Sequence, residues 1–191
     1  MQGDSATFRN GADLRIGFLG GGQLGRMTIQ AALDLDYRIH ILDPDPQCPC
    51  ARIAHQFTQG DLNDAEAVIA WGRTLDVVTV EIENVSIEGL TALKAMGVQV
   101  LPDPAHLALI RDKGTQKEFY ADHGIPTSDF ALVEDGRAEV LSRGLPVVQK
   151  LRTGGYDGRG VQIIRTEADA ADAFDAPSVL EDAVDLSLIH I

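Results

Sequence analysis

The stretch Lys150–Gly160 reads KLRTGGYDGRG and follows the short apolar run Leu145–Gln149. The β-branched valines of that run predict a strand, and Val161–Ile164 predicts a second strand after the glycines. The connection between them is longer than the roughly two to five residues of a simple turn. Glycines permit positive φ and bring backbone N–H groups close to an anion, and Lys150 adds a point charge. The stretch therefore predicts a phosphate-holding hairpin loop in preference to a mobile surface hairpin.

Composition excludes several classes of protein. The chain has 191 residues, a formal net charge of −13, 45% hydrophobic residues and 24% charged residues. This acidic balance, without long runs of Lys or Arg, argues against nucleic acid or an anionic membrane as the main partner. The apolar runs are far too short for a membrane span, and the N-terminus lacks a signal-peptide core. We therefore expect a cytoplasmic protein that holds any anionic substrate by local basic groups.

The two cysteines, Cys48 and Cys50, stand in a CPC segment. A spacing of two residues is poor for a disulfide and incomplete for zinc, which takes four ligands. We expect reduced loop thiols and no metal site.

The first third of the chain predicts a βαβ unit. Leu14–Leu19 is expected to form a buried strand, RMTIQAALDL after Gly25 a helix with Met27, Ile29, Ala31 and Leu33 at helical spacing, and Tyr37–Leu42 a second strand. The turn Gly20–Gly25 fits G-x-G-x-x-G, and Asp43 follows the second strand. An acidic residue there is typical of NAD-binding units, but the glycine pattern alone is a weak signal.

More elements of a doubly wound sheet follow. Pro44–Gln59 is predicted as a loop. The predicted helices are Asn63–Arg73 and Ser86–Met96, and the predicted strands are Asp76–Glu81 and Val98–Leu101. Trp71 is expected in the core. Glu81 and Glu83 follow a parallel strand at its carboxyl end, where ligands of open α/β sheets bind. Two interpretations stay open for these carboxylates: substrate positioning or orientation of the glycine-rich turn, and capping of the next helix.

The second half begins with helical pieces at Ala105–Arg111 and Gly114–His123, and Gly124-Ile125-Pro126 then starts a new unit. Beyond the break, the predicted strands are Phe130–Val133 and Ser178–Glu181. The predicted helices are Arg137–Arg143 and a segment from Thr166 to about Phe174.

At the loop the chain resembles a known family. GGYDGRG after a strand that ends in lysine resembles the signature loop of 5-(carboxyamino)imidazole ribonucleotide synthases, the ATP-grasp enzymes of bacterial and fungal purine biosynthesis. The resemblance extends to GGGQLGRM (20–27), TVEIENV (79–85), TQKEF (115–119), GIPTSDF (124–130) and VLEDAVDL (179–186). It implies an α/β fold: an N-terminal doubly wound, Rossmann-like pre-ATP-grasp domain followed by the first part of an ATP-grasp α+β lobe. We expect a disordered leader at 1–13, the two domains at 14–111 and 112–186, and an atypical tail at 187–191.

The resemblance also implies the reaction and the residues that serve it. The expected reaction is ATP-dependent carboxylation of 5-aminoimidazole ribonucleotide with bicarbonate by way of carboxyphosphate. The positions that match catalytic residues are Tyr156, Asp157 and Arg159. Those that match ATP-binding residues are Lys113, Lys150, Gly155, Gly158, Gly160, Glu181, Asp182, Ala183 and Val184. Those expected to bind the ribonucleotide are Gly22, Gln23, Leu24 and Glu81.

The last residues depart from the family pattern. Ser187–Ile191 reads SLIHI, and Ile189 stands where the family carries an ATP-contacting glutamate. The Mg²⁺ ligands of the family lie further on, so we expect a truncated product that is inactive alone and provides no metal ligand itself. The family suggests a homodimer, formed through the N-terminal domain, for the full-length protein.

Three alternatives remain open on the sequence. A different ATP-grasp ligase of carboxylase or formyl-transfer type would share the fold but lack the YDGR core. An NAD-dependent oxidoreductase would need only the first βαβ unit and would leave GGYDGRG unexplained. A non-catalytic nucleotide-binding fragment could retain the first domain without a magnesium site.

Overall fold

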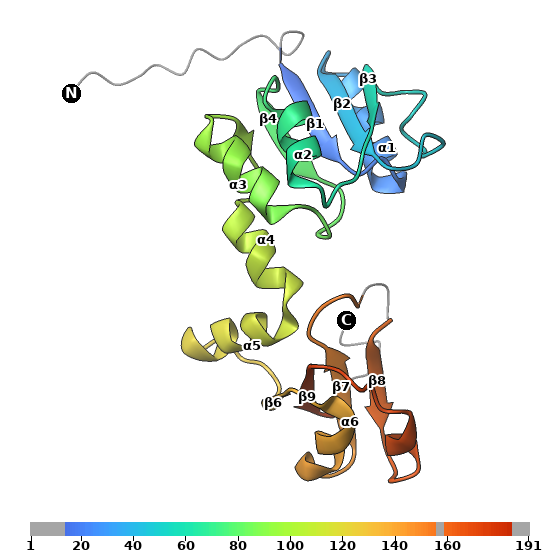
Figure 1. Cartoon of the computed structure of the whole chain (residues 1–191), viewed down its shortest axis with the longest axis vertical. Helices are drawn as coiled ribbons and strands as arrows, with labels where there is room; N and C mark the ends of the chain where they lie inside the picture. Colours follow the sequence, from blue (N-terminus) through green and yellow to red (C-terminus); the bar gives the residue numbers. More distant parts are fainter. Residues whose placement is uncertain (1–13, 156–158, 185–191) are drawn as a thin grey trace, which may run out of the picture. The chain divides into compact units, whose positions relative to one another are not determined.

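The computed structural model describes residues 14–155 and 159–184 and divides into two compact units, one ending at Leu107 and the other beginning at Ala108 (Figure 1). Within these described ranges, no helix is both long enough and apolar enough to cross a membrane.

The N-terminal unit is built on a five-stranded parallel sheet of order β3-β2-β1-β4-β5. Its strands are β1 (Arg15–Leu19), β2 (Arg38–Asp43), β3 (Gln56–Gln59), β4 (Val77–Val80) and β5 (Gln99–Val100). Its helices are α1 (Gln23–Leu33), α2 (Ala65–Gly72) and α3 (Ile87–Ala95), and α4 (Pro104–Arg111) crosses the division between the units. This arrangement confirms the predicted doubly wound domain.

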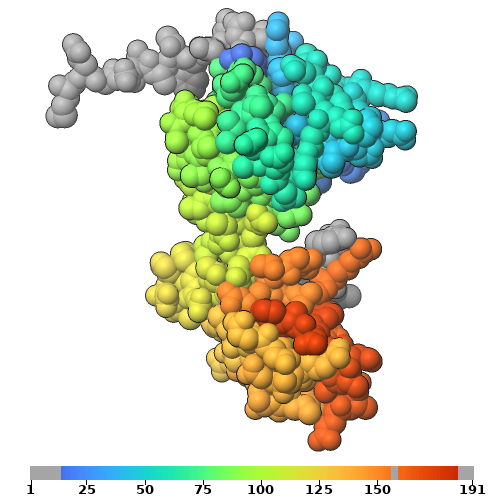
Figure 2. Space-filling model, viewed as in Figure 1, coloured from blue at the N-terminus to red at the C-terminus, as the bar shows by residue number. Residues whose placement is uncertain are grey.

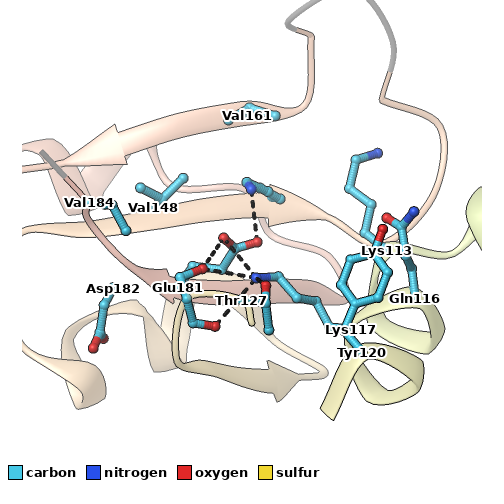
Figure 3. Close-up of a pocket in the computed structure, with 12 residues that line it drawn as sticks. Lys113, Gln116, Lys117, Tyr120, Thr127, Val148, Val161, Glu181, Asp182 and Val184 are labelled. Carbon is cyan, nitrogen blue, oxygen red and sulfur yellow. Dashed lines mark hydrogen bonds and ion pairs between the residues drawn. The ribbon is translucent and has the colours of Figure 1, made fainter. Parts of the chain in front are cut away.

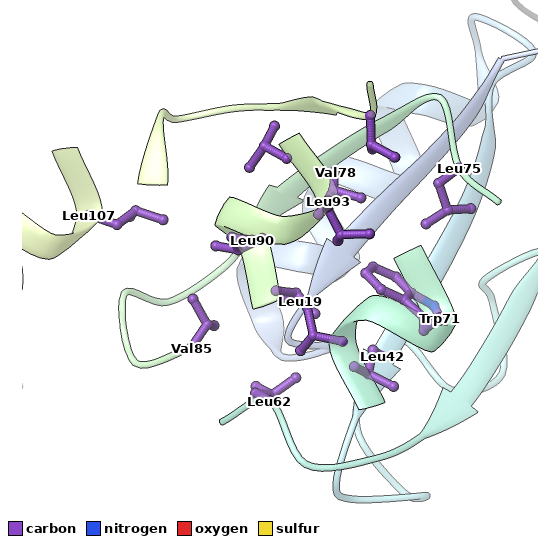
Figure 4. Packing of buried hydrophobic residues seen from close by; sticks show 13 residues of the cluster. Leu19, Leu42, Leu62, Trp71, Leu75, Val78, Val85, Leu90, Leu93 and Leu107 are labelled. Atoms are coloured by element: carbon purple, nitrogen blue, oxygen red, sulfur yellow. The ribbon is translucent and has the colours of Figure 1, made fainter. Parts of the chain in front are cut away.

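Alternate side chains of the central strands enter two cores, one on each face of the sheet. Ile39 and Ile41 of β2 pack with Ile29 of α1, whereas Leu42 packs with α2 and α3. The second cluster holds Trp71 among aliphatic side chains (Figure 4). Trp71 is 9% exposed, which confirms its expected place in the core. Burial on both faces explains why apolar side chains occur on both faces of these strands.

Two expectations for this unit are wrong. The helix begins at Gln23 and buries Gly25, Ile29 and Ala32, so that Met27 and Leu33 point outward. The residues expected at helical spacing are two positions apart, whereas a helical face repeats every three to four.

The expected loop Pro44–Gln59 ends in a strand, β3, which the sequence analysis missed. This strand forms one edge of the sheet, and the space-filling view shows the cyan segment around it at the surface (Figure 2). Its ends are two exposed glutamines, so no apolar alternation indicated it.

The C-terminal unit contains an antiparallel four-stranded sheet of order β6-β9-β7-β8. The strands are β6 (Phe130–Val133), β7 (Val147–Leu151), β8 (Val161–Ile164) and β9 (Ser178–Asp182). The helices are α5 (Lys113–Asp122), α6 (Gly136–Glu139) and the short 3-10 turns η2 (Val140–Arg143) and η3 (Asp169–Asp172). The antiparallel pairing of β7 with β8 confirms the predicted hairpin strands.

The helix expected from Thr166 to about Phe174 is reduced to the 3-10 turn η3. Asp169 accepts hydrogen bonds from the backbone N–H groups of Arg165 and Thr166, both at 2.9 Å. At the other end, the buried Gln149 side chain bonds both the N–H and the carbonyl of Phe174. These contacts hold the segment in a tight turn and prevent a longer helix.

Candidate functional site

A pocket of about 580 Å³ lies within the C-terminal unit, between α5 and the sheet (Figure 3). It is lined by Lys113, Gln116, Lys117, Tyr120, Thr127, Ser128, Val148, Lys150, Val161, Glu181, Asp182 and Val184. Five of these were predicted as ATP-binding residues: Lys113, Lys150, Glu181, Asp182 and Val184. The fold therefore brings together residues that are up to 71 positions apart in the chain.

The floor of the pocket is a buried carboxylate held between two lysines. Glu181 is 6% exposed; its Oε1 lies 2.8 Å from Lys150 Nζ and its Oε2 lies 3.2 Å from Lys117 Nζ. The Ser128 hydroxyl donates a further hydrogen bond to Oε2 at 2.7 Å. A buried carboxylate is stable only when it is paired and hydrogen-bonded in this way.

The same contacts keep Glu181 ionised. Burial alone would raise its pKa, but hydrogen bonds from Lys150 and Ser128, the charge of Lys150 and a hydrogen bond from Lys117 outweigh the loss of water. The pKa of Glu181 consequently lies below its ordinary value of 4.5. The side chain of Glu181 is therefore engaged by Lys150, Ser128 and Lys117.

Lys113 reaches the glycine-rich hairpin loop from the start of α5. Its Nζ lies 3.4 Å from the carbonyl of Gly155, and its backbone N–H donates to the carbonyl of Arg152 at 2.9 Å. The two strands of the loop are close here, because a Cβ on Gly155 would lie 2.7 Å from the carbonyl oxygen of Arg159. Gly160 adopts a φ of 73°, which favours glycine.

A second ion pair ties the base of this loop to α5. Arg152 Nε and Nη2 donate to the two carboxylate oxygens of Asp112 at 3.0 and 2.7 Å. Asp112 is also the N-cap of α5 and accepts the backbone N–H groups of Gly114 and Thr115. The hydrogen bond from Arg152 lowers the pKa of Asp112 below its ordinary value. Lys113, next to Asp112, is thereby kept beside the loop.

Three of the loop residues that the sequence singled out, Tyr156, Asp157 and Gly158, lie outside the described residues. Arg159 is described and exposed. Among the predicted ATP-binding residues at and after the end of β9, Asp182 forms an ion pair with Arg143 at 2.9 Å. The exposed Val184 borders the pocket together with Val148 and Val161. Ala183 is partly buried and is not among the lining residues.

The remaining predicted residues meet at the glycine-rich turn of the N-terminal unit. Glu81 Oε2 accepts the N–H of Gly22 at 2.5 Å, and Oε1 accepts the N–H of Gly25 at 2.9 Å. Gln23 and Leu24 follow on the exposed first turn of α1. Of the two interpretations left open for Glu81, the contacts favour orientation of the turn, while Ser86 caps the next helix.

These contacts argue against the dinucleotide alternative. In an NAD-binding unit the free N–H groups at the helix N-terminus face a pyrophosphate. Here two of them are bonded to the carboxylate of Glu81, whose charge would repel phosphate. Asp43, the expected ribose ligand, accepts the N–H of Gly21 at 2.7 Å instead.

The described residues include no group of three or more His, Cys, Asp or Glu side chains that could hold a metal ion, and both cysteines are free and buried. The two carboxylates that line the pocket are each paired with basic side chains. The described residues that line the pocket therefore do not fit a Mg²⁺ site.

Sequence reasoning missed the residues beneath the pocket, above all Lys117. It is 8% exposed, and its Nζ lies 2.6 Å from Thr127 Oγ1 and 2.9 Å from Ser128 Oγ. The TQKEF and GIPTSDF motifs contain all three residues, but spacing alone did not indicate that they meet.

Family models match most of the chain. The model of the ribonucleotide synthetase preATP-grasp domain matches residues 14–111, which is just over half of the chain, and that of the ATP-grasp domain matches residues 118–188. Both models agree with the fold class expected from the sequence.

Individual proteins similar to this chain are named N5-carboxyaminoimidazole ribonucleotide synthases or synthetases. The chain is 35% identical over 162 residues to the N5-carboxyaminoimidazole ribonucleotide synthase of Staphylococcus aureus, which covers 83% of this chain and 43% of that protein. The solved S. aureus N5-carboxyaminoimidazole synthetase with ADP is 32% identical, with a TM-score of 0.84 over 92% of this chain and 48% of that one. The Aspergillus clavatus enzyme, solved with ADP and 5-aminoimidazole ribonucleotide, is 31% identical, with a TM-score of 0.78 over 89% and 46%. The chain thus spans less than half the length of these relatives.

Proposed function

Because the chain belongs to the ribonucleotide synthetase pre-ATP-grasp family, we propose that it forms part of a ligase that carboxylates 5-aminoimidazole ribonucleotide. ATP would phosphorylate bicarbonate to give ADP and carboxyphosphate. Carboxyphosphate would break down to phosphate and carbon dioxide, which the exocyclic amine of the ribonucleotide captures with loss of a proton. The product is 5-(carboxyamino)imidazole ribonucleotide, an intermediate of purine biosynthesis. A cytoplasmic location fits this metabolic role.

The observation that carries the proposal is the basic pocket of the C-terminal unit. Lys113, Lys117 and Lys150 bring three positive charges to a pocket in a chain whose formal net charge is −13. Two carboxylates line it, and one of them, Asp182, is balanced by Arg143. A local excess of positive charge beside the apolar side chains of Val148 and Val161 suits a nucleotide, whose base is apolar on its faces and whose phosphates are anionic.

Roles follow from these positions. Lys113 and Lys150 would neutralise the ATP phosphates, and Gly155, Gly158 and Gly160 would let the loop approach them closely. The hinge residues Glu181, Asp182, Ala183 and Val184 would hold the nucleoside, with backbone groups in place of the Glu181 side chain.

Other residues of the same loop would serve the substrates that react. Tyr156, Asp157 and Arg159 would face ribonucleotide and bicarbonate, with Asp157 orienting the substrate amine. Fixed charges that stabilise carboxyphosphate and exclude water from it are the expected source of catalysis.

In the N-terminal unit, Gly22, Gln23 and Leu24 would line the ribonucleotide pocket. Glu81 would shape that pocket by fixing the turn, through the two hydrogen bonds described above. We propose 14–111 and 112–186 as the two domains, and a homodimer through the first of them for the full-length enzyme.

Mg²⁺ would accompany ATP, as phosphoryl transfer requires a cation between the phosphates. We assign it no ligand among the described residues and expect its ligands in the C-terminal part of full-length relatives.

Phosphate release tests the proposal. The substrates are Mg²⁺–ATP and bicarbonate, with and without 5-aminoimidazole ribonucleotide. The chain would be compared with a chimera that carries the remaining C-terminal part of the S. aureus relative. We expect ribonucleotide-dependent release by the chimera and none by the chain alone. Lys150→Met in the chimera is the matched negative control. Release by neither protein, together with a higher melting temperature of the chain in NAD, would overturn the proposal in favour of a dinucleotide-binding protein.

A further inference from the structure

Lys117 is a buried cation that contributes to the charge of the pocket but to which the proposed function assigns no individual role. It lies on α5 at the bottom of the pocket, and its exposed fraction is well below that of the Lys150 side chain, which is 30% exposed. A lysine is rarely buried to this extent unless it is paired. Its surroundings therefore indicate a specific function beneath the pocket surface.

The contacts of Lys117 form a chain that ends at Lys150. Thr127 Oγ1 and Ser128 Oγ hold Lys117 Nζ from one side, at 2.6 and 2.9 Å. Lys117 and Ser128 then share Glu181 Oε2, and Figure 3 shows Lys117 beside Glu181. Glu181 Oε1 lies 2.8 Å from Lys150 Nζ. Each carboxylate oxygen thus has its own lysine, and the position of Lys150 depends on how Glu181 is oriented.

The charges of Lys117, Glu181 and Lys150 matter as well as their contacts. Glu181 alone would cancel the charge of Lys150, since an ion pair is neutral as a whole. With Lys117 the three groups carry a net charge of +1, and the more exposed of the two lysines is Lys150. Lys117 therefore preserves the attraction of this site for an anion.

We propose that Lys117 is a positioning residue for polyphosphate: it orients Glu181, and through it Lys150, and offsets the carboxylate charge. The proposal rests on the proposed function, because it takes the pocket to be a nucleotide site. It predicts that Lys117 affects the phosphate-dependent part of binding and not the binding of the nucleoside.

The test measures the affinity of the chain itself for ADP and for adenosine by equilibrium dialysis. The variants are Lys117→Met, Lys150→Met and the double variant. Lys94→Met is the control, since it removes one positive charge from an exposed pair with Asp103 in the N-terminal unit. We expect Lys117→Met to weaken ADP binding roughly tenfold, about 1.4 kcal/mol. Adenosine binding should stay within about twofold. In the Lys150→Met background the same change should cost clearly less than in the wild type, because the orienting effect is already lost and only the effect of the Lys117 charge remains.

Each result separates the two proposals. Equal losses for ADP and adenosine would show that Lys117 only supports the fold, and full losses that add in the double variant would show that it acts without Lys150. Either result overturns the role of Lys117 and leaves the nucleotide site intact. A wild-type chain that retains neither ligand overturns the nucleotide site, and the role of Lys117 with it.

Discussion

Glu81→Ala should destabilise the N-terminal unit through the glycine-rich turn. The variant removes the carboxylate that accepts the N–H groups of Gly22 and Gly25, at 2.5 and 2.9 Å. Gly22 is the N-cap of α1 and has no side chain that could replace this acceptor. Alanine at position 81 therefore leaves two N–H groups at the start of the helix without their partner.

The size of the effect follows from the contacts. A hydrogen bond to a charged group contributes about 1.5–3 kcal/mol, and both bonds here are partly buried. Water can reach part of the site in the variant, so we take the lower end and expect a loss of about 2–3 kcal/mol. For a domain of about 100 residues this corresponds to a fall in Tm of roughly 10 °C or more. Glu81→Gln retains one acceptor oxygen and should lie between wild type and Glu81→Ala.

Urea unfolding followed by tryptophan fluorescence measures this loss in the right unit, because Trp71 is the single tryptophan of the chain and lies in the N-terminal core. Glu83→Ala is the matched control, since Glu83 is exposed two residues further along the same loop. We expect the control to change the free energy of unfolding by less than about 0.5 kcal/mol. A Glu81→Ala variant as stable as the control would refute the conclusion that this carboxylate holds the turn.

Three other predictions concern single side chains. The hydrogen bond from Arg152 lowers the pKa of Asp112, so the contribution of this carboxylate to stability is present above about pH 4 and is lost as the pH falls further. Asp112→Asn keeps the N-cap, and its Tm in thermal melts should therefore fall less in acid than that of the wild type. Burial, together with the charge of nearby carboxylates, raises the pKa of Cys50 to about 11. At pH 8 iodoacetamide should therefore modify Cys50 at least roughly a hundredfold more slowly in the native chain than in urea, and equal rates would contradict the conclusion that this thiol is buried. Gln149→Leu should cost about 2–4 kcal/mol by circular dichroism in urea, since the fully buried amide serves both the backbone of residue 174 and the Ser178 hydroxyl; a loss below about 1 kcal/mol would refute that network.

Local sequence patterns predicted the strands whose residue types match their burial in the fold. The strands around Ile39 and Val147 are short segments that contain β-branched residues and have sharp ends, and sequence reasoning located both. It failed where side-chain contacts replace periodicity. The exposed glutamines of β3 contain no alternation, and the helix expected after Thr166 is prevented by Gln149, a residue of another strand. No window of local sequence contains that contact.

In the candidate site too, local patterns predicted which positions are important but not which residues they contact, and Glu81 and Lys117 show why. Both carry a charge at a position that a short motif contains, so the sequence could indicate that something happens there. The function of each is set by partners 56 to 64 residues away, at Gly25 and at Glu181. When its partner is not known, a charge can be assigned to a ligand or to the protein itself, and both interpretations of Glu81 stayed open on the sequence. Once the partners are known, both carboxylates hold parts of the protein. Under the proposed function, the groups that would meet a nucleotide are then the lysines beside Glu181.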